Sequence, residues 1–305
     1  MSRIFDALKR SETERWGNDL LTPPESVQEL LEAVENRRLA PAEAAASAAA
    51  PLPAMAALSA DDAFALESLP VVRPAPASDA RLVCLSDPGS LGAEKFRVLG
   101  LRLRNLRETR KVKRIVVTGT APQEGKSLVA CNLALNQARS KVLKTLLIDG
   151  DFRRPMVAKR LGVGALLPGL SECLRGEKQL SEVVYRVDGS GLYILPAGLA
   201  PDNPLELMQS GRLAEYLDRL GSAFDWIIID TPPIFPLADT TFWMKVSDGV
   251  LFVVREGVTE RKVLQRAVDV LDRQTILGVV VNSCEGRRDH KYYYSRYGQD
   301  AVKSD

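Results

Sequence analysis

The chain has 305 residues, of which 46% are hydrophobic and 26% charged, and its formal net charge is +2. This supports a sizeable core and gives no overall basic field that would indicate nucleic acid binding. The four cysteines are widely spread without a CxxC pair, which argues against a disulfide framework or a zinc site. The only histidine, His290, lies near the C-terminus, which excludes a histidine-based site in the core. No apolar run reaches the ~18–20 residues of a membrane span, and no signal peptide is apparent, so we expect a cytoplasmic protein.

Residues 1–80 differ in composition from the rest and are expected to form a separate N-terminal region. Two short helices are predicted there, one with Ile4, Phe5 and Leu8 on one face and one over Glu25–Leu39. They either dock on a partner or remain a solvated pair, because short isolated helices are only marginally stable in water. The Ala- and Pro-rich stretch Ala40–Pro76 has too few large apolar side chains to offset the entropy cost of ordering, and it predicts a flexible linker.

Strand and helix patterns alternate over residues 81–285, which predicts an α/β domain with a doubly wound, mostly parallel sheet. We expect strands at Leu82–Leu85, Arg114–Thr118, Leu143–Ile148, Leu192–Leu195, Trp226–Ile229, Gly249–Val254 and Leu277–Val281. We expect helices at Leu91–Leu106, Ser127–Arg139, Pro204–Leu220 with a break near Gly211, and Thr259–Arg273. Several of these strands are almost continuous Val, Ile and Leu, as is typical of strands covered on both faces. A polar, disordered tail, residues 286–305, is expected to follow.

The first motif is a candidate phosphate loop between a buried strand and a helix. Backbone N–H groups at the start of that helix would face a β-phosphate, Lys126 would reach the β- and γ-phosphates, and Ser127 would bind Mg²⁺. The strict pattern GxxxxGK[ST] is not met, because Thr120 stands where the first glycine belongs. The context of strand, loop and helix nevertheless favours a P-loop NTPase fold over a chance Gly-Lys-Ser. The expected nucleotide-binding residues are Thr120, Ala121, Pro122, Gln123, Glu124, Gly125, Lys126, Ser127 and Leu128.

Two further motifs end apolar runs in carboxylates. Asp149 and Asp151 follow one predicted strand, and Asp230 ends another. Ligands of parallel α/β sheets bind at the carboxyl ends of the strands, and acids close together there repel one another unless a cation lies near them. Mg²⁺ prefers such oxygen ligands. The alternative for each motif alone is a solvated turn at the end of a strand.

Taken together, the three motifs resemble those of the bacterial tyrosine kinases of polysaccharide assembly, in the cytoplasmic form without a membrane span. The resemblance is carried by Leu147-Ile148-Asp149-Gly150-Asp151-Phe152-Arg153 and Ile228-Ile229-Asp230-Thr231-Pro232. It extends to Glu94-Lys95-Phe96-Arg97, to Asn203-Pro204 and to Leu277-Gly278-Val279-Val280-Val281-Asn282. The middle motif is the specific one. The early lysine of MinD/ParA-type ATPases is absent, since Thr120, Ala121 and Pro122 stand in its region.

The resemblance implies an ATP- and Mg²⁺-dependent protein-tyrosine kinase that phosphorylates its own tail in trans and regulates capsular or exopolysaccharide export. It implies catalytic roles for Lys126, Asp149, Asp151 and Asp230, metal ligation by Ser127, Asp149, Asp151 and Asp230, and nucleotide binding by Asn282. The acceptors would be Tyr292, Tyr293, Tyr294 and Tyr297. The alternative for this cluster is a sticky or disordered terminus.

The resemblance also implies assembly. Glu94 and Arg97 would belong to the helix through which such kinases form rings, although Gly100 replaces the second arginine of the family's ExxRxxR pattern. A membrane activator of the chain-length-determinant type would recruit the chain to the inner face of the plasma membrane. Two alternatives stay open: a MinD/ParA-like ATPase switch, and a nucleotide-gated assembly module without kinase activity.

Overall fold

The computed structural model describes residues 65–140, 142–164, 166–235, 238–271 and 274–283, without the side chains of residues 238 and 270. The predicted N-terminal helices, most of the predicted linker and the tyrosine-rich tail lie outside these residues. None of the helices in the described ranges is long and apolar enough to cross a membrane.

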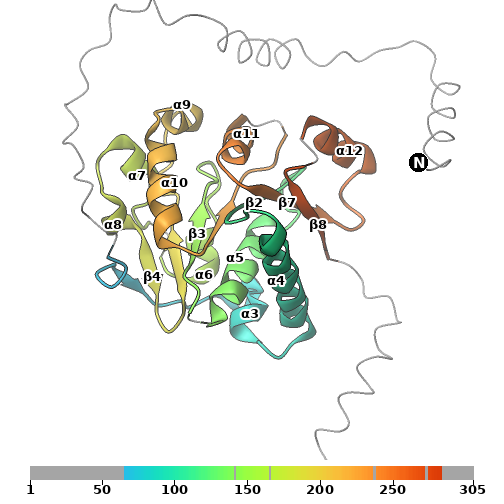
Figure 1. Cartoon of the computed structure of the whole chain (residues 1–305), viewed down its shortest axis with the longest axis horizontal. Helices are drawn as coiled ribbons and strands as arrows, with labels where there is room; N and C mark the ends of the chain where they lie inside the picture. Colours follow the sequence, from blue (N-terminus) through green and yellow to red (C-terminus); the bar gives the residue numbers. More distant parts are fainter. Residues whose placement is uncertain (1–64, 141, 165, 236–237, 272–273, 284–305) are drawn as a thin grey trace, which may run out of the picture. The chain divides into compact units, whose positions relative to one another are not determined.

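A single eight-stranded sheet forms the centre of the described part of the chain, in the order β1-β4-β5-β3-β6-β2-β7-β8 (Figure 1). Its strands are β1 (Val71–Val72), β2 (Arg114–Gly119), β3 (Thr145–Asp149), β4 (Tyr185–Val187), β5 (Leu192–Leu195), β6 (Trp226–Asp230), β7 (Gly249–Arg255) and β8 (Ile276–Asn282). All neighbouring pairs are parallel except β4 with β5. The prediction of a doubly wound, mostly parallel sheet is confirmed.

Helices cover both faces of the sheet, and each face has its own apolar core. One face packs against α3 (Val83–Ser86), α4 (Leu91–Thr109), α5 (Lys126–Gln137) and α6 (Val157–Leu161). The other packs against α7 (Leu170–Arg175), α8 (Leu180–Val183), α9 (Pro204–Met208), α10 (Arg212–Ala223), α11 (Ala238–Lys245) and α12 (Arg261–Val270). Two short 3₁₀ helices, η1 (Ser78–Ala80) and η2 (Ala138–Ser140), complete the described elements. Strands buried on both faces explain why the sequence shows continuous apolar runs rather than alternation.

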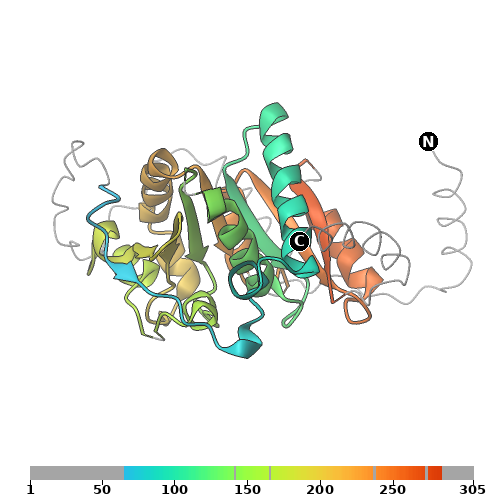
Figure 2. The same ribbon diagram turned by 90° about the horizontal axis from the view of Figure 1, so that it is seen from below.

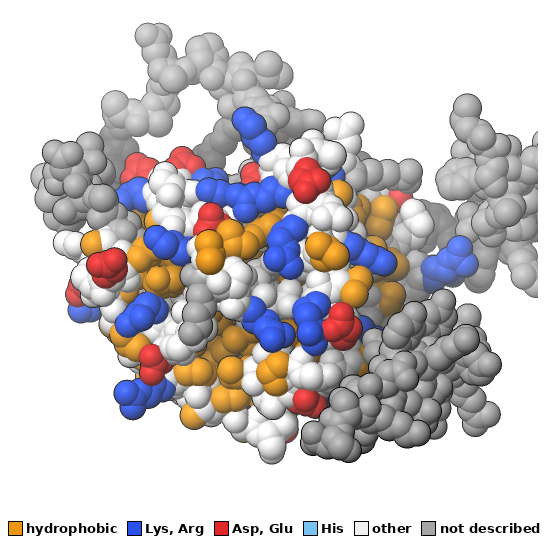
Figure 3. Space-filling model, turned by 60° about the horizontal axis from the view of Figure 1, so that its bottom comes forward, with side chains coloured by type: hydrophobic (Ala, Val, Ile, Leu, Met, Phe, Trp, Pro, Cys, Tyr) orange, Lys and Arg blue, Asp and Glu red, His pale blue; other side chains and the backbone are white. Residues whose placement is uncertain are grey.

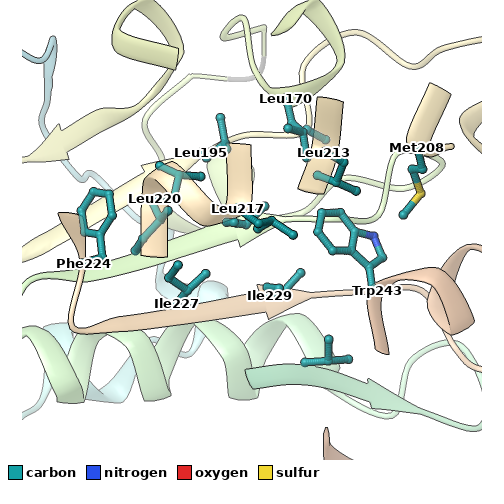
Figure 4. Packing of buried hydrophobic residues seen from close by; sticks show 14 of the residues in the cluster. Leu170, Leu195, Met208, Leu213, Leu217, Leu220, Phe224, Ile227, Ile229 and Trp243 are labelled. Atoms are coloured by element: carbon teal, nitrogen blue, oxygen red, sulfur yellow. The ribbon is translucent and has the colours of Figure 1, made fainter. Parts of the chain in front are cut away.

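Helix α10 shows how the second face is built. Its Leu213, Leu217 and Leu220 recur at helical spacing and are 1% exposed each. In Figure 4 Leu217 and Leu220 lie over Ile227 and Ile229 of β6, and Leu213 lies beside Trp243. Burying a leucine of this kind contributes about 1.5–3 kcal/mol. This packing fixes β6, and with it the position of the acid that ends the strand.

Two sequence predictions are wrong. The predicted strand Leu82–Leu85 is instead the single-turn helix α3, whose Cys84 N–H donates to the Asn132 side chain on α5 at 3.0 Å. A four-residue apolar run does not separate a strand from a buried helical turn. The C-terminal part of the predicted linker is packed rather than free, since Leu66 and Leu69 are buried and β1 pairs with β4.

Several elements have no counterpart in the prediction, among them β1, β4, α6 and α11. The two strands are only two and three residues long, too short for a periodic signal. Helix α11 contains two threonines and two aromatic residues, which are weak helix formers. The break in the predicted helix Pro204–Leu220 is confirmed, because α9 and α10 are separated at Gly211, whose φ is 81°.

Gly100 is where α4 crosses α5, and the two helices lie side by side in Figures 1 and 2. It is buried, and a Cβ at this position would overlap the Asn136 amide nitrogen. Glu94 and Arg97, by contrast, are partly exposed and form an ion pair at 2.9 Å. An arginine at position 100 therefore has no room in this packing. The departure from ExxRxxR has a local steric cause.

We expect Gly100→Ala to destabilise the protein by about 1–3 kcal/mol, because the new methyl group overpacks the crossing of the helices. The matched control is Gly92→Ala in the same helix, where a Cβ makes only ordinary contact with Val83. That change should be neutral or stabilising by up to about 1 kcal/mol. Urea unfolding of both variants checks this, and equal effects of the two would contradict the packing argument. Adding Asn136→Ala to Gly100→Ala should restore part of the loss.

Candidate functional site

The three motifs meet at one edge of the sheet because their strands are neighbours. The register pairs Asp149 of β3 with Asp230 of β6, and Asp230 with Val117 near the end of β2. The loop after β2 leads directly into α5, which begins at Lys126. Three stretches that are far apart in the sequence are therefore placed together by parallel strand pairing alone.

The loop between β2 and α5 has a backbone that only a few residues tolerate. Gln123 and Gly125 both lie in the left-handed region, with φ values of 64° and 97°. A side chain at Gly125 would overlap the amide group of Asn282 at the end of β8. The same Asn282 amide donates to the Glu124 carbonyl at 2.9 Å. The loop is thus held against β8 as it enters the helix, and the first N–H groups of α5 lack partners within the helix, as at any helix start.

Lys126 is 7% exposed and its ammonium group donates to the Ala121 carbonyl at 2.6 Å across the loop. Burial lowers the pKa of Lys126, while the nearby charges of Glu124, Asp230 and Asp151 act in the opposite direction. A lysine folded across its own loop in this way is close to the backbone groups that a phosphate would contact. It is positioned to compensate phosphate charge.

Asp149 is buried at the end of β3 and holds the loop that follows. One of its oxygens accepts from the N–H groups of Met156 and Val157 at 2.8 and 2.9 Å, and the other from Asp151 at 3.3 Å. Burial raises the pKa of Asp149 well above its usual range, and the charge of Asp230 raises it further. Asp149 is therefore a structural support for this loop as well as a candidate ligand.

Asp230, at the end of β6, is a fully buried carboxylate with a strongly raised pKa. Burial raises its pKa to about 7, a nearby Ser127 hydroxyl lowers it, and Asp151 raises it. Neither carboxylate oxygen has a hydrogen bond of normal geometry within the described residues, although both are buried. An unsatisfied buried carboxylate beside a hydroxyl fits a hard divalent cation such as Mg²⁺. In the described ranges no three His, Cys, Asp or Glu side chains form a complete metal site by themselves.

The loop that carries Asp151 contacts α11 through an ion pair and a hydrogen bond. Arg153 forms an ion pair with the buried Asp239 at 3.0 Å, and the Trp243 indole N–H donates to the Gly150 carbonyl at 3.1 Å. Figure 4 shows Trp243 beyond the carboxyl end of β6, next to Leu213. Neither Asp239 nor Trp243 was expected from the sequence, since α11 carries no motif and was not predicted.

The remaining predicted residues are distributed unevenly. Thr120 is buried in the loop, whereas Pro122 and Gln123 are exposed at its tip and Ser127 and Leu128 are half-buried at the helix start. Glu94 and Arg97 lie on α4 rather than among the motif residues. The four tail tyrosines Tyr292, Tyr293, Tyr294 and Tyr297 lie outside the described residues.

A groove of about 670 Å³ occurs at the opposite end of the sheet, where the central strands begin. It is lined by Arg107, Lys111, Val112, Lys113, Arg114, Asp218, Gly221, Ser222 and Asp248. Figure 3 brings the lower end of the molecule forward and shows Lys and Arg side chains spread among apolar ones. None of the motif residues lines this groove, so it is separate from the candidate nucleotide site.

We expect Asp230→Asn to stabilise the protein when no nucleotide or divalent cation is present. With a pKa raised from 3.8 to about 7 on folding, Asp230 contributes stability that is lost as the pH rises through this window. The variant should exceed the parent by about 1 kcal/mol or more at pH 8, and the gain should vanish near pH 4. Urea unfolding at several pH values measures this. The exposed Asp202→Asn is the control, and parallel pH curves for Asp230→Asn and the parent would refute the assignment.

Comparisons with known proteins show which proteins this chain resembles. No family model matches the chain. It is 30% identical to the tyrosine-protein kinase YwqD of Bacillus subtilis over 215 residues, which are 70% of this chain and 90% of that protein. It is 29% identical to the tyrosine-protein kinase CpsD of Streptococcus agalactiae over 61% of this chain and 82% of CpsD. By contrast, it spans only 25% of the putative tyrosine-protein kinase EpsB of Ralstonia solanacearum, at 33% identity.

Solved structures show the same fold. The kinase domain of the Escherichia coli tyrosine kinase ETK matches with a TM-score of 0.64 and 25% identity, over 73% of this chain and 92% of that one. The chimerical protein CapA2B2 matches with a TM-score of 0.63 and 28% identity, over 72% of this chain and 96% of that one. The phosphate loop, the acids of β3 and β6 and this similarity lead to one conclusion: the chain belongs to the family of bacterial tyrosine-protein kinases.

Proposed function

We propose that this kinase transfers the γ-phosphoryl group of ATP to the tyrosines of its own C-terminal tail, on a neighbouring copy of the chain. The observation that carries the proposal is the buried carboxylate of Asp230, which lies beside Ser127 and Lys126 and has no hydrogen bond of normal geometry among the described residues. A buried carboxylate of this kind destabilises the protein when no ligand is bound, and a phosphate-bound cation would provide the missing partner.

In this proposal the residues of the site have separate tasks. Lys126 and the first N–H groups of α5 bind and orient the phosphates. Ser127 and Asp230 are the main ligands of Mg²⁺, and Asp149 and Asp151 support them in the metal site. The bound Mg²⁺ supplies neutralisation of the charge that develops on the phosphate oxygens.

The phosphoryl transfer then needs positioning more than a strong base. The phenolic oxygen of the acceptor forms a bond to the γ-phosphorus, the bond from that phosphorus to the β–γ bridging oxygen breaks, and ADP leaves. Asp151 takes the phenolic proton in this scheme. It is only half-buried, whereas Asp149 is almost fully buried and both its oxygens accept backbone N–H groups.

The acceptors proposed are Tyr292, Tyr293, Tyr294 and Tyr297 in the segment 286–305. Support comes from where the chain leaves the sheet, because Asn282 at the end of β8 contacts the phosphate loop. The ten residues from Ser283 to Tyr292 span at most about 30 Å, and the whole tail about twice that. This reach suits a site on an adjacent copy. Glu94 and Arg97 on α4 remain our candidates for the contact between copies.

We further propose a membrane activator as partner, which would bring the chain to the inner face of the membrane for polysaccharide export. The chimerical protein CapA2B2 shares the fold over 96% of its own chain. The two helices predicted within residues 1–39 are the candidate for this contact.

We expect Lys126→Ala to lower tail phosphorylation by about a hundredfold or more, because it removes a donor to the transferred group. Incubation with Mg·ATP followed by mass spectrometry of residues 286–305 measures this. The control is Lys178→Ala, an exposed lysine that pairs with Glu182 away from the site. Absence of phosphotyrosine in the parent protein, even with its activator, would refute the kinase proposal.

Transfer between copies is tested with two proteins. A chain lacking residues 286–305 serves as the enzyme and the full Lys126→Ala chain as the acceptor. We expect phosphotyrosine on the acceptor, since its own site is inactive. Unmodified acceptor together with a phosphorylated parent protein would show transfer within one chain. ATP hydrolysis without any phosphotyrosine would favour the ATPase-switch alternative.

A further inference from the structure

Glu124 belongs to the phosphate loop, and its carboxylate is buried. The nucleotide-binding role predicted from the loop motif does not account for the contacts of this carboxylate. It is 0% exposed. One oxygen accepts from the N–H groups of Thr120 and Ala121 at 2.7 and 3.0 Å. The other accepts from the hydroxyls of Thr120 and Thr259 at 2.5 and 2.6 Å. Burying an isolated carboxylate costs several kcal/mol, so four donors converging on one group indicate a built arrangement.

Arg255, at the end of β7, sets the direction of the hydrogen bonds in this network. The Thr259 hydroxyl oxygen accepts from the Arg255 N–H at 2.9 Å, so its hydrogen is available for Glu124. Arg255 ends β7, and Thr259 lies in the turn before α12. The Glu124 backbone carbonyl accepts from Asn282 at the end of β8. One residue therefore joins the loop that leaves β2 to the ends of two further strands.

The backbone around Glu124 needs such support. Its neighbours Gln123 and Gly125 both have positive φ values, and a left-handed non-glycine residue costs about 1 kcal/mol or more. Strained backbone persists only where its surroundings hold it. The Glu124 side chain lies between the two left-handed residues and is anchored at four points. It also satisfies the N–H groups of Thr120 and Ala121, whereas the first N–H groups of α5 have no partner within the helix.

We propose that Glu124 is a positioning residue for ATP: through Thr120, Ala121 and Thr259 it fixes the phosphate loop to the β7–α12 turn in the arrangement that binds the phosphates. This inference rests on the proposed nucleotide site. The charge of Glu124 cannot account for this role, because a negative charge by itself repels phosphate. The benefit must come from the shape that the carboxylate imposes on the loop.

The test compares Glu124→Ala with Glu172→Ala in the full chain. Glu172 is the matched control, a buried carboxylate in the first turn of α7 that accepts from Gly169 and Leu199 N–H groups at 2.7 and 2.9 Å, away from the motif residues. The readouts are the dissociation constant of a fluorescent ATP analogue with Mg²⁺, the KM and kcat of tail phosphorylation, and the unfolding midpoint in urea without nucleotide.

We expect Glu124→Ala to raise the dissociation constant and the KM for ATP by about tenfold, with kcat within about threefold of the parent. Glu172→Ala should lower the unfolding midpoint to a similar extent and leave ATP binding unchanged. Glu124→Gln should have a smaller effect on binding than Glu124→Ala, because its amide oxygen still accepts both backbone N–H groups. Equal ATP binding by folded Glu124→Ala and the parent, or equal losses of binding for the two alanine variants, would overturn the proposal.

Thr259 provides a second route if Glu124→Ala does not fold. Thr259→Val removes the hydroxyl at nearly constant shape and should weaken ATP binding about threefold, whereas Thr259→Ser should bind as the parent does. Unchanged binding by Thr259→Val overturns the role of the turn. If the parent itself binds no ATP analogue, the proposed nucleotide site fails and this inference with it. If the parent binds ATP but forms no phosphotyrosine, only the kinase proposal fails, and the dissociation constants still decide the role of Glu124.

Discussion

The parallel pairing of β3 with β6, and of β6 with β2, is the constraint on which the rest of this structure depends. It aligns Asp149 with Asp230 and brings both beside the loop that starts after Gly119. Carboxylates placed side by side in a core repel each other and lose their water, and the raised pKa values of both groups express that cost. Apolar packing on both faces, from α5 on one side and α10 on the other, keeps the strands in this register.

Much of this arrangement follows from the sequence. Apolar runs ending in Asp, and one leading into Gly-Lys-Ser, are enough to place three motifs at the carboxyl edge of a parallel sheet. The side of the site formed by α11 could not be predicted in this way. Trp243 and Asp239 contact Gly150 and Arg153 across β6, and such contacts depend on tertiary packing between segments without a motif. The prediction of a strand at Leu82–Leu85 is wrong for a related reason, since that segment packs on α5 and its Cys84 N–H donates to the Asn132 side chain.

The two loops of the site are supported by different means. The loop after β3 folds around Asp149 and Asp151, whose carboxylates accept N–H groups from their own following residues. The loop after β2 depends on partners from β7 and β8. Changes at the β8 edge of the sheet are therefore expected to reach the phosphate loop more directly than the acid-bearing loop. Since the polar tail begins just beyond β8, this edge also connects the proposed acceptor segment to the loop that would hold the donor.

The unsatisfied carboxylate of Asp230 also has a consequence for the protein in a cell. A ligand that binds only the folded chain stabilises it by mass action, and here the folded chain without ligand retains an electrostatic penalty at neutral pH. Local opening near β6 should therefore be most frequent in molecules that carry no nucleotide, and proteases act on opened molecules. The abundance of such a protein would then follow the supply of its ligand, without any dedicated degradation signal.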